Sequence, residues 1–339
     1  MSDCTRSRAL NRFVWVLSAA TLFLICSGGM VTSKNAGLAV PDWPTTFGYN
    51  MFLFPVSQWV GGIFFEHTHR LIASAIGLFT IVLAVWLWRA EERRWLRMLG
   101  WIAFAAVILQ GVLGGLRVTM LKDEIGIFHA CLAQAFFALL VFIGLATSRT
   151  WTRQGRAPAA VLWLPFVTTL LIYFQLALGA TMRHQHRDLA ILDFPLAYGE
   201  VIPDTSAETL ARVNEWREAR ALSTVDAGHI WLQMAHRFVA LLITAGVIGY
   251  SIAARRNETP LQLRQVSTVW ALCIVVQVTL GAWTIWSNKA ADVATAHVAV
   301  GATMLALGVS VCALTIRARA TGHRAQVPAR FRPEEAHAL

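Results

Sequence analysis

Charged side chains are scarce in this sequence. Asp, Glu, Lys and Arg make up 14% of the 339 residues, whereas hydrophobic residues make up 56% and the mean hydropathy is +0.54. A soluble globular protein carries about 25% charged residues. The shortage therefore excludes an ordinary soluble protein and predicts an all-α membrane protein.

Hydropathy predicts eight apolar segments, each long enough to cross a bilayer as a helix of about 20 residues. They lie at 13–32, 69–88, 98–118, 126–147, 160–180, 231–252, 266–286 and 293–315. No cleavable signal is evident, because the first segment runs to full spanning length, and we expect it to be retained as a helix.

Cysteine is also scarce where it could form structural disulfides. Of the five cysteines, Cys26, Cys131, Cys273 and Cys312 fall inside predicted spans and Cys4 lies in the N-terminal tail. None lies in a predicted outer loop, so the sequence indicates no disulfide framework.

Acidic residues are outnumbered, with 19 Asp and Glu against 29 Lys and Arg, which gives a net charge of +10. Eighteen of the basic residues lie in the two tails and in three short loops: Arg6, Arg8 and Arg12; Arg89, Arg93, Arg94 and Arg97; Arg149, Arg153 and Arg156; Arg255, Arg256 and Arg264; and five in the C-terminal tail. Because cytoplasmic loops carry such an excess, we expect both termini and these loops in the cytoplasm. The clustering favours contact with membrane lipid, and we expect no nucleic-acid binding.

The two halves of the chain resemble each other. "GGMVTSKNAGLAVPDWPTTFG" at 28–48 shares its framework with "GATMRHQHRDLAILDFPLAYG" at 179–199, at an offset of 151 residues. "EHTHR" at 66–70 matches "QMAHR" at 233–237 at an offset of 167. The change of offset marks a polar insertion near 204–219 in the second outer loop.

Each copy of this repeat holds four spans, an even number, so both copies point the same way across the membrane. The predicted fold is therefore eight transmembrane helices arranged as two tandem pseudo-symmetric four-helix bundles. One bundle is expected from residues 1–157 and the other from residues 158–339, which include the cytoplasmic tail.

Four histidines occupy equivalent positions in the two copies. His69 and His129 lie at the start of the second and fourth spans, and His236 and His297 at the start of the sixth and eighth. All four are therefore expected near the outer face, at similar depth. An ionisable side chain within a span is costly and is a candidate for function.

Two imidazoles in each half restrict the chemistry. Zinc takes three or four protein ligands, and copper sites add Cys or Met, which these spans lack beside the histidines. Iron porphyrin brings four nitrogens and needs only one or two axial imidazoles. The sequence therefore predicts one haem site in each half, and Arg70 and Arg237 could each bind a haem propionate.

The two copies differ at one carboxylate, because Glu66 of the first becomes Gln233 in the second. Glu66 shares a helix face with His69, three residues on, where a carboxylate can accept a proton or stabilise positive charge. The difference favours one haem held for electron transfer and another exposed to chemistry. The alternative for Glu66 is an ion pair with Arg70.

Several polar and small residues have no single interpretation. Gln-x-x-x-Gly recurs at Gln110 and Gly114, Gln175 and Gly179, and Gln277 and Gly281, with Gly28 and Gly29 at the matching place in the first span. Such glycines permit close helix packing, and they also leave room for a flat ligand. The sequence assigns no role to His67, His184, His186 or His229.

The eight spans, the doubled four-helix unit, "GLAVPDWP", "EHTHR", "QMAHR" and the two later histidines resemble the haem A synthase family over about residues 13–315. The resemblance implies an oxidoreductase that converts the C8 methyl group of haem O to the formyl group of haem A by successive hydroxylations and loss of water. It implies a haem b cofactor, a haem O synthase as supplier and cytochrome oxidase as the destination of haem A. The implied location is the cytoplasmic membrane.

The resemblance also implies roles for individual residues. Glu66 matches the catalytic glutamate of the family. His69 and His129 are the implied axial residues for the substrate haem, and His236 and His297 hold haem b. Whether one or both residues of the first pair bind the substrate iron is left open.

One departure concerns the first outer loop. Many bacterial members of the family carry a cysteine pair there, whereas this chain has Val40 and Thr46 in that region. The resemblance therefore does not extend to a thiol–disulfide step in turnover or to a disulfide that stabilises this loop. The electron acceptor and the oligomeric state are not fixed by the sequence, which is compatible with a homo-oligomer.

Two other classes of function remain. A di-haem b-type cytochrome that passes electrons between quinol and a partner would use the same four histidines, but it gives no reason for the Glu66 difference. A transporter with parallel repeats predicts ionisable residues near mid-membrane, whereas these cluster at the outer ends of the spans.

Overall fold

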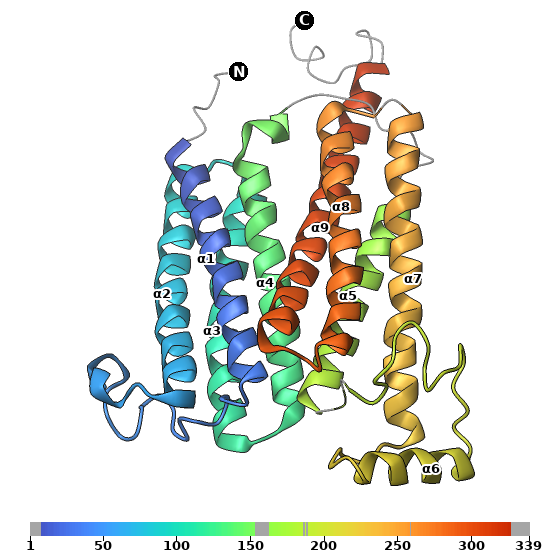
Figure 1. The fold of residues 1–339 in the computed structure, drawn as a ribbon. Helices are drawn as coiled ribbons and strands as arrows, with labels where there is room; N and C mark the ends of the chain where they lie inside the picture. Colours follow the sequence, from blue (N-terminus) through green and yellow to red (C-terminus); the bar gives the residue numbers. More distant parts are fainter. Residues whose placement is uncertain (1–7, 153–162, 186, 188, 258, 327–339) are drawn as a thin grey trace, which may run out of the picture.

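The structure is a computed structural model that describes residues 8–152, 163–185, 187, 189–257 and 259–326. This part of the chain is helical apart from loops and two isolated β-bridges. Eight of its helices are long and apolar enough to cross a membrane, so the chain is an integral membrane protein (Figure 1). The predicted all-α class is confirmed.

The eight predicted spans all form helices, and each helix begins earlier or ends later than hydropathy indicates. They are α1 (Arg8–Ser33), α2 (Gly61–Ala90), α3 (Arg94–Met120), α4 (Asp123–Thr147), α5 (Trp163–His184), α7 (Ala227–Arg256), α8 (Leu261–Trp286) and α9 (Ala291–Gln326). The predicted boundary between residues 157 and 158 lies outside the described residues.

The long helices pack as two rings of four. In the first ring α1 contacts α2, α2 contacts α3, α3 contacts α4, and α4 returns to α1. The second ring repeats the order with α5, α7, α8 and α9. The rings meet where α9 packs on α1 and α4, and where α4 packs on α5 (Figure 1). This pattern agrees with two tandem bundles related by a pseudo-two-fold axis.

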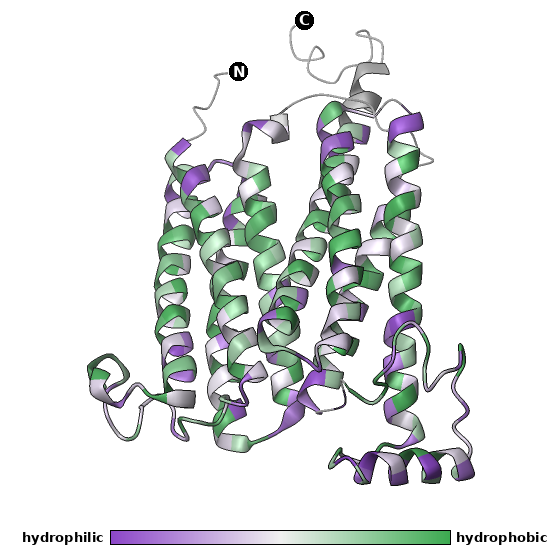
Figure 2. Cartoon of the chain, viewed as in Figure 1, coloured by the Kyte–Doolittle hydropathy of each residue, from purple (hydrophilic) through white to green (hydrophobic). Residues whose placement is uncertain are grey.

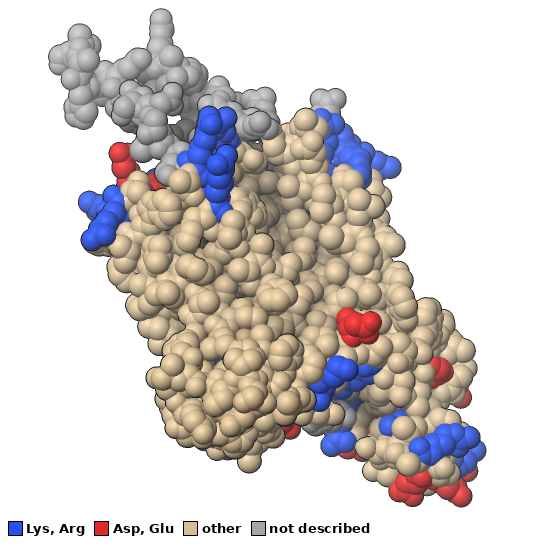
Figure 3. All heavy atoms as spheres, turned by 60° about the vertical axis from the view of Figure 1, so that its left-hand side comes forward, with Lys and Arg blue, Asp and Glu red and all other residues tan. Residues whose placement is uncertain are grey.

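Polar residues gather at the two ends of the molecule. The long helices are mostly hydrophobic along their length, and hydrophilic residues mark the helix ends and the short helix α6 (Ala207–Glu218) (Figure 2). On one face, a broad surface with few charges separates one end, where basic residues predominate, from the other end, where basic and acidic residues are mixed (Figure 3). The start of α1 and the last turns of α9 lie at the same end of the bundle (Figure 1).

Apolar side chains fill the inner part of each bundle, toward the end that carries the start of α1. In the first bundle the buried cluster includes Val14, Leu83 and Leu140, with exposed fractions of 0%. In the second, Tyr250 and Trp270 are fully buried, and the Trp270 indole donates to the Met304 carbonyl at 3.0 Å. The four repeated histidines lie nearer the other end, which we call the outer end.

The outer loops after α1 and α5 repeat one turn. The Asp42 carboxylate accepts hydrogen bonds from the backbone N–H groups of Phe47 and Gly48 at 2.7 and 2.9 Å. The Asp193 carboxylate accepts from Tyr198 and Gly199 at 2.8 and 2.9 Å. Both glycines have positive φ, +77° and +83°, a conformation that favours glycine. The loop repeat predicted from the sequence is therefore present.

The predicted polar insertion forms the helix α6. The Ser206 hydroxyl caps its N-terminus by accepting from the Thr209 N–H. At its other end the buried Arg217 guanidinium donates to the carbonyls of Ser223, Leu189 and Ala190. These bonds fasten α6 to the loop that follows α5.

Candidate functional site

The four repeated histidines face one another in pairs within each bundle. His69 of α2 and His129 of α4 come from helices on one diagonal of the first ring, and His236 of α7 and His297 of α9 from the matching diagonal of the second. The two members of each pair are close enough to interact electrostatically. The structure thus brings the predicted residues together as two separate pairs.

Glycines on the other diagonal make room for these rings. A Cβ atom on Gly28 of α1 would lie 3.0 Å from Cε1 of His69, and one on Gly114 of α3 would lie 3.2 Å from Cε1 of His129. Gly179 and Gly281 stand in the same relation to His236 and His297, at 3.3 and 3.1 Å. The repeated glycines therefore seat the imidazoles, a role that neither sequence interpretation named.

The four histidine rings share one feature: a buried Nδ1 atom without a hydrogen-bond partner. Each ring is partly accessible, yet its Nδ1 atom is buried and makes no hydrogen bond. For His129 and His297, the backbone carbonyls of Gln110 and Gln277 lie nearby, one turn before the seating glycine. A small movement would let Nδ1–H donate to such a carbonyl, which fixes the tautomer and leaves Nε2 for a metal.

These observations fit haem better than a bare metal ion. Among the described residues, no three His, Cys, Asp or Glu side chains are grouped so as to hold a metal ion. A pair of imidazoles supplies two axial positions, and a porphyrin would supply the other four.

Glu66 ties the first bundle to its outer loop. Its exposed fraction is 4%, and its Oε1 atom forms an ion pair with Arg70 at 2.6 Å. Its Oε2 atom accepts a hydrogen bond from the Val40 N–H at 2.9 Å. The ion pair considered from the sequence is therefore formed, and it is joined to the loop backbone.

Gln233 makes the equivalent contact in the second bundle. Its Oε1 atom accepts from the Ile191 N–H at 2.8 Å, and its Nε2 atom donates to the Ile191 carbonyl at 3.1 Å. Because Val40 and Ile191 are repeat equivalents, both side chains hold the same loop position. At this contact the two halves differ by one negative charge, which Glu66 carries and Gln233 lacks.

The two arginines that follow the histidines also bind the loops. Arg70 donates through Nη1 to the carbonyls of Asp42 and Thr45, and through Nη2 to the Val40 carbonyl and Glu66. Arg237 donates to the carbonyls of Asp193, Pro195 and Leu196. Propionate binding by these arginines stays a prediction; their hydrogen bonds to the loops all use Nη atoms, and Nε of Arg237 is buried without a hydrogen-bond partner.

The other histidines have different surroundings. His67 is fully buried between the rings of Phe54 and Trp59, with its Nδ1 atom 3.2 Å from the Thr46 hydroxyl. His229 caps α7 in a reciprocal arrangement with Asp226. These contacts give both residues a local structural role.

His184 is buried, with an exposed fraction of 8%, and contacts Arg117. The sequence assigns no role to it, and the structure shows that the end of α5 packs against the first bundle at this point. His186 lies outside the described residues.

The first outer loop covers the end of α3 beside the His129 seat. The Trp43 indole occupies the space in front of Gly115, where a Cβ atom would lie 2.3 Å from its Cδ2 atom. The equivalent residues of the second half are Phe194 and Ala282. The first half thus combines the larger ring, Trp43, with the smaller helix residue, Gly115.

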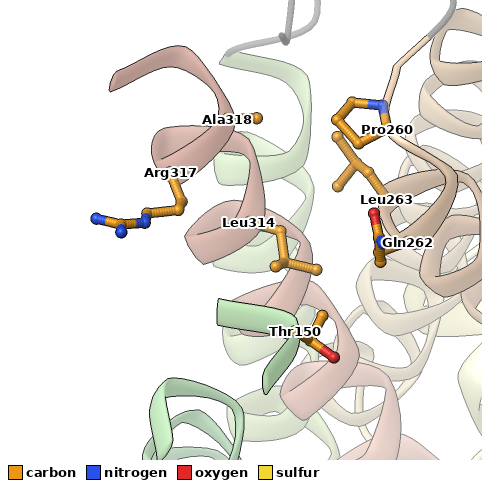
Figure 4. A pocket seen from close by; sticks show the side chains of 7 residues that line it. All are labelled: Thr150, Pro260, Gln262, Leu263, Leu314, Arg317 and Ala318. Atoms are coloured by element: carbon orange, nitrogen blue, oxygen red, sulfur yellow. The ribbon is translucent and has the colours of Figure 1, made fainter. Parts of the chain in front are cut away.

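A small pocket at the opposite end does not belong to this site. It has a volume of about 20 Å³, close to that of one water molecule. Its lining is Thr150, Pro260, Gln262, Leu263, Leu314, Arg317 and Ala318 (Figure 4). It is too small for a porphyrin.

The glycine seats lead to a first prediction. Replacing Gly281 with Val would push a side chain into the His297 ring and, through overpacking of about 1–3 kcal/mol, should weaken haem retention roughly tenfold or more. The haem content of the purified protein, from its Soret absorbance per polypeptide, measures this effect.

Gly111→Val is the matched control for this prediction. A Cβ atom on Gly111 would meet nothing within 4 Å, and the equivalent residue of α8 is already Val278. Equal haem content in the Gly281 and Gly111 variants would contradict the seating role.

Comparison with known proteins identifies the family. Residues 11–309 match the family described as cytochrome oxidase assembly protein (COX15-CtaA). A protein of Shouchella clausii named Heme A synthase is 30% identical over 60% of this chain and 68% of its own length. Proteins of that name from Geobacillus kaustophilus and Rhodopseudomonas palustris are 24% and 27% identical. They cover 86% and 89% of this chain, and 86% and 90% of their own lengths.

The family match covers both histidine pairs and all eight spanning helices, apart from the ends of the first and last. It thus includes both bundles and both outer loops. The chain therefore belongs to the COX15-CtaA family of cytochrome oxidase assembly proteins.

Proposed function

We propose that this chain is a haem A synthase, an oxidoreductase that converts the C8 methyl group of haem O to a formyl group. One observation carries the proposal. Each bundle holds a pair of histidines packed against glycines, and only the first pair has a carboxylate, Glu66, beside it. Relatives named Heme A synthase support it over most of the chain. The haem A formed would serve cytochrome oxidase, and a haem O synthase would supply the substrate.

The two bundles divide the work in this proposal. His236 and His297 hold a haem b cofactor in the bundle of residues 158–339, where the neutral Gln233 occupies the position of the carboxylate. His69 and His129 bind the iron of haem O in the bundle of residues 1–157. Bound haem iron supplies the redox chemistry.

Glu66 is the proposed catalytic residue of the first bundle. It lies three residues before His69 on α2, so the two side chains share one helix face. Its carboxylate can stabilise positive charge that develops at the substrate, or accept a proton at Oε1 once Arg70 moves away. Arg70 and the Val40 N–H fix its orientation.

The orientation in the membrane follows from the charges. We place the α2–α3 and α7–α8 connections and both termini in the cytoplasm, because they carry the repeated arginines. The histidine pairs and the loops bound by Glu66 and Gln233 then lie near the outer face of the cytoplasmic membrane.

A b-type cytochrome that only transfers electrons is the second candidate. The two histidine pairs suit it equally well. The charge difference between Glu66 and Gln233 favours the synthase, because electron transfer alone requires no carboxylate in one half.

Haem extraction tests the proposal directly. The chain is produced together with a haem O synthase in cells that lack haem A, and extracted haems are analysed by mass. We expect a porphyrin that carries the formyl group, together with haem b bound to the purified protein. Accumulation of haem O alone, with the chain folded and haem-loaded, would support the cytochrome instead.

A further inference from the structure

Arg117 is a half-buried cation at the outer end of α3, and its guanidinium donors are largely unused. Its Nε atom is buried and has no hydrogen-bond partner. Its Nη2 atom lies 3.4 Å from Nδ1 of His184, which is its only hydrogen-bond contact within the described residues. No carboxylate there lies within ion-pair distance of it; Glu66 and Asp123 act on it only from farther away.

Two glycines create the space that Arg117 occupies. A Cβ atom on Gly126 of α4 would lie 2.7 Å from Nε of Arg117 and 2.6 Å from Nδ1 of His184. A Cβ atom on Gly37 would lie 2.7 Å from its Nη1 atom. The side chains of α3 and α5 therefore meet across a bare stretch of α4, at the seam between the two bundles.

This cation lies next to the proposed substrate site. Arg117 follows Gly114, the seat of His129, by three residues on α3, and Gly126 precedes His129 by three residues on α4. The guanidinium is therefore about one helical turn from the His129 ring, on its outer side, and the two interact electrostatically.

An unpaired guanidinium in such surroundings is typical of an oxyanion site. Burying a cation without a partner is costly, whereas Arg binds a carboxylate through two parallel hydrogen bonds. Arg70 is less available, because both its Nη atoms already donate to the loop and Glu66. In the second bundle Thr284 stands at the equivalent position and donates to the Leu280 carbonyl. The arginine that interacts electrostatically with His297, Arg183, comes from α5 and already donates through Nη2 to the Gly29 carbonyl and the Ser33 hydroxyl.

We propose that Arg117 binds a carboxylate of the substrate porphyrin and so orients it in the first bundle, with His184 holding the guanidinium from α5. The proposal rests on the proposed function, because it requires a porphyrin on His129. In this proposal the propionate of the porphyrin in the first bundle contacts Arg117, which lies at the seam between the two bundles.

The test compares a porphyrin diacid with its diester. The full-length protein with haem b in place is titrated with ferric protoporphyrin IX and with its dimethyl ester, and binding is followed by the Soret band. We expect Arg117→Gln to weaken binding of the diacid roughly 10- to 100-fold and to leave the diester unchanged. Arg117→Lys should lose less, because it keeps the charge.

Two controls separate the possible failures. Arg89→Gln, at the exposed cytoplasmic end of α2, should change neither titration. Equal weakening of diacid and diester by Arg117→Gln, or of neither, would overturn the Arg117 site and leave the proposed function standing. Diacid binding that survives replacement of both His69 and His129 with Ala would overturn both. Retention of haem b in the Arg117 variants reports that they fold.

Discussion

Replacing Glu66 with Gln should abolish haem A formation while the protein keeps its haem b and its fold. Gln233 shows how a glutamine sits at this position, bonded to the N–H and carbonyl of the loop residue. A glutamine introduced in place of Glu66 can make the same contacts with Val40, so the loop remains attached. Loss of a preorganised electrostatic contact to the reacting group costs about 10²- to 10³-fold in rate.

The measurement is haem A per polypeptide in cells that also make haem O, with haem b content as the internal standard. The reciprocal change, Gln233→Glu, is the matched control, since it adds a carboxylate at the equivalent position of the second bundle. We expect it to leave haem A formation within severalfold of the original. Undiminished haem A in Glu66→Gln would remove the carboxylate from the mechanism.

Replacing His236 and His297 together with Ala should remove the b-type spectrum of the purified protein. Both rings are seated on glycine and have buried Nδ1 atoms that make no hydrogen bond. Loss of even an outer-shell partner lowers metal affinity about 10- to 100-fold, and loss of both direct ligands should cost at least that much. Reduced-minus-oxidised absorbance, normalised to protein, measures the loss.

The pair His69 and His129 provides the comparison for this experiment. Changing both to Ala should preserve the b-type spectrum and abolish haem A formation, because the proposed function assigns these residues to the substrate haem. Loss of the b-type spectrum on replacing His69 and His129, with retention on replacing His236 and His297, would reverse the assignment of the two bundles.

Much of the architecture could be predicted from the sequence. The spans follow from hydropathy. The pairing of His69 with His129 follows from their places at the start of two spans that cross the membrane in the same direction, which puts both residues at similar depth. The ion pair of Glu66 with Arg70 follows from helical spacing. These relations depend on local periodicity or on comparison of the chain with itself.

Other features depend on contacts between distant segments. Arg117 and His184 are 67 residues apart and meet only because Gly126 leaves α4 bare. Helices such as α3 and α8 are apolar on all sides, so the sequence does not indicate which face turns inward. The Ser206 cap before residues 207–218 is the signal that could have predicted α6 as a helix.

The packing of Trp43 on Gly115 has a consequence for how the two halves diverged. Their counterparts, Phe194 and Ala282, show that both members of this loop–helix contact differ between the copies. A tryptophan facing an alanine would collide with its methyl group, so the larger ring is tolerated only beside the smaller helix residue. The two positions therefore form an epistatic pair, because a tryptophan at position 43 requires glycine at position 115. A chimera that carries the first outer loop in the second half, without the matching helix residue, would place the tryptophan against Ala282 and recreate this collision.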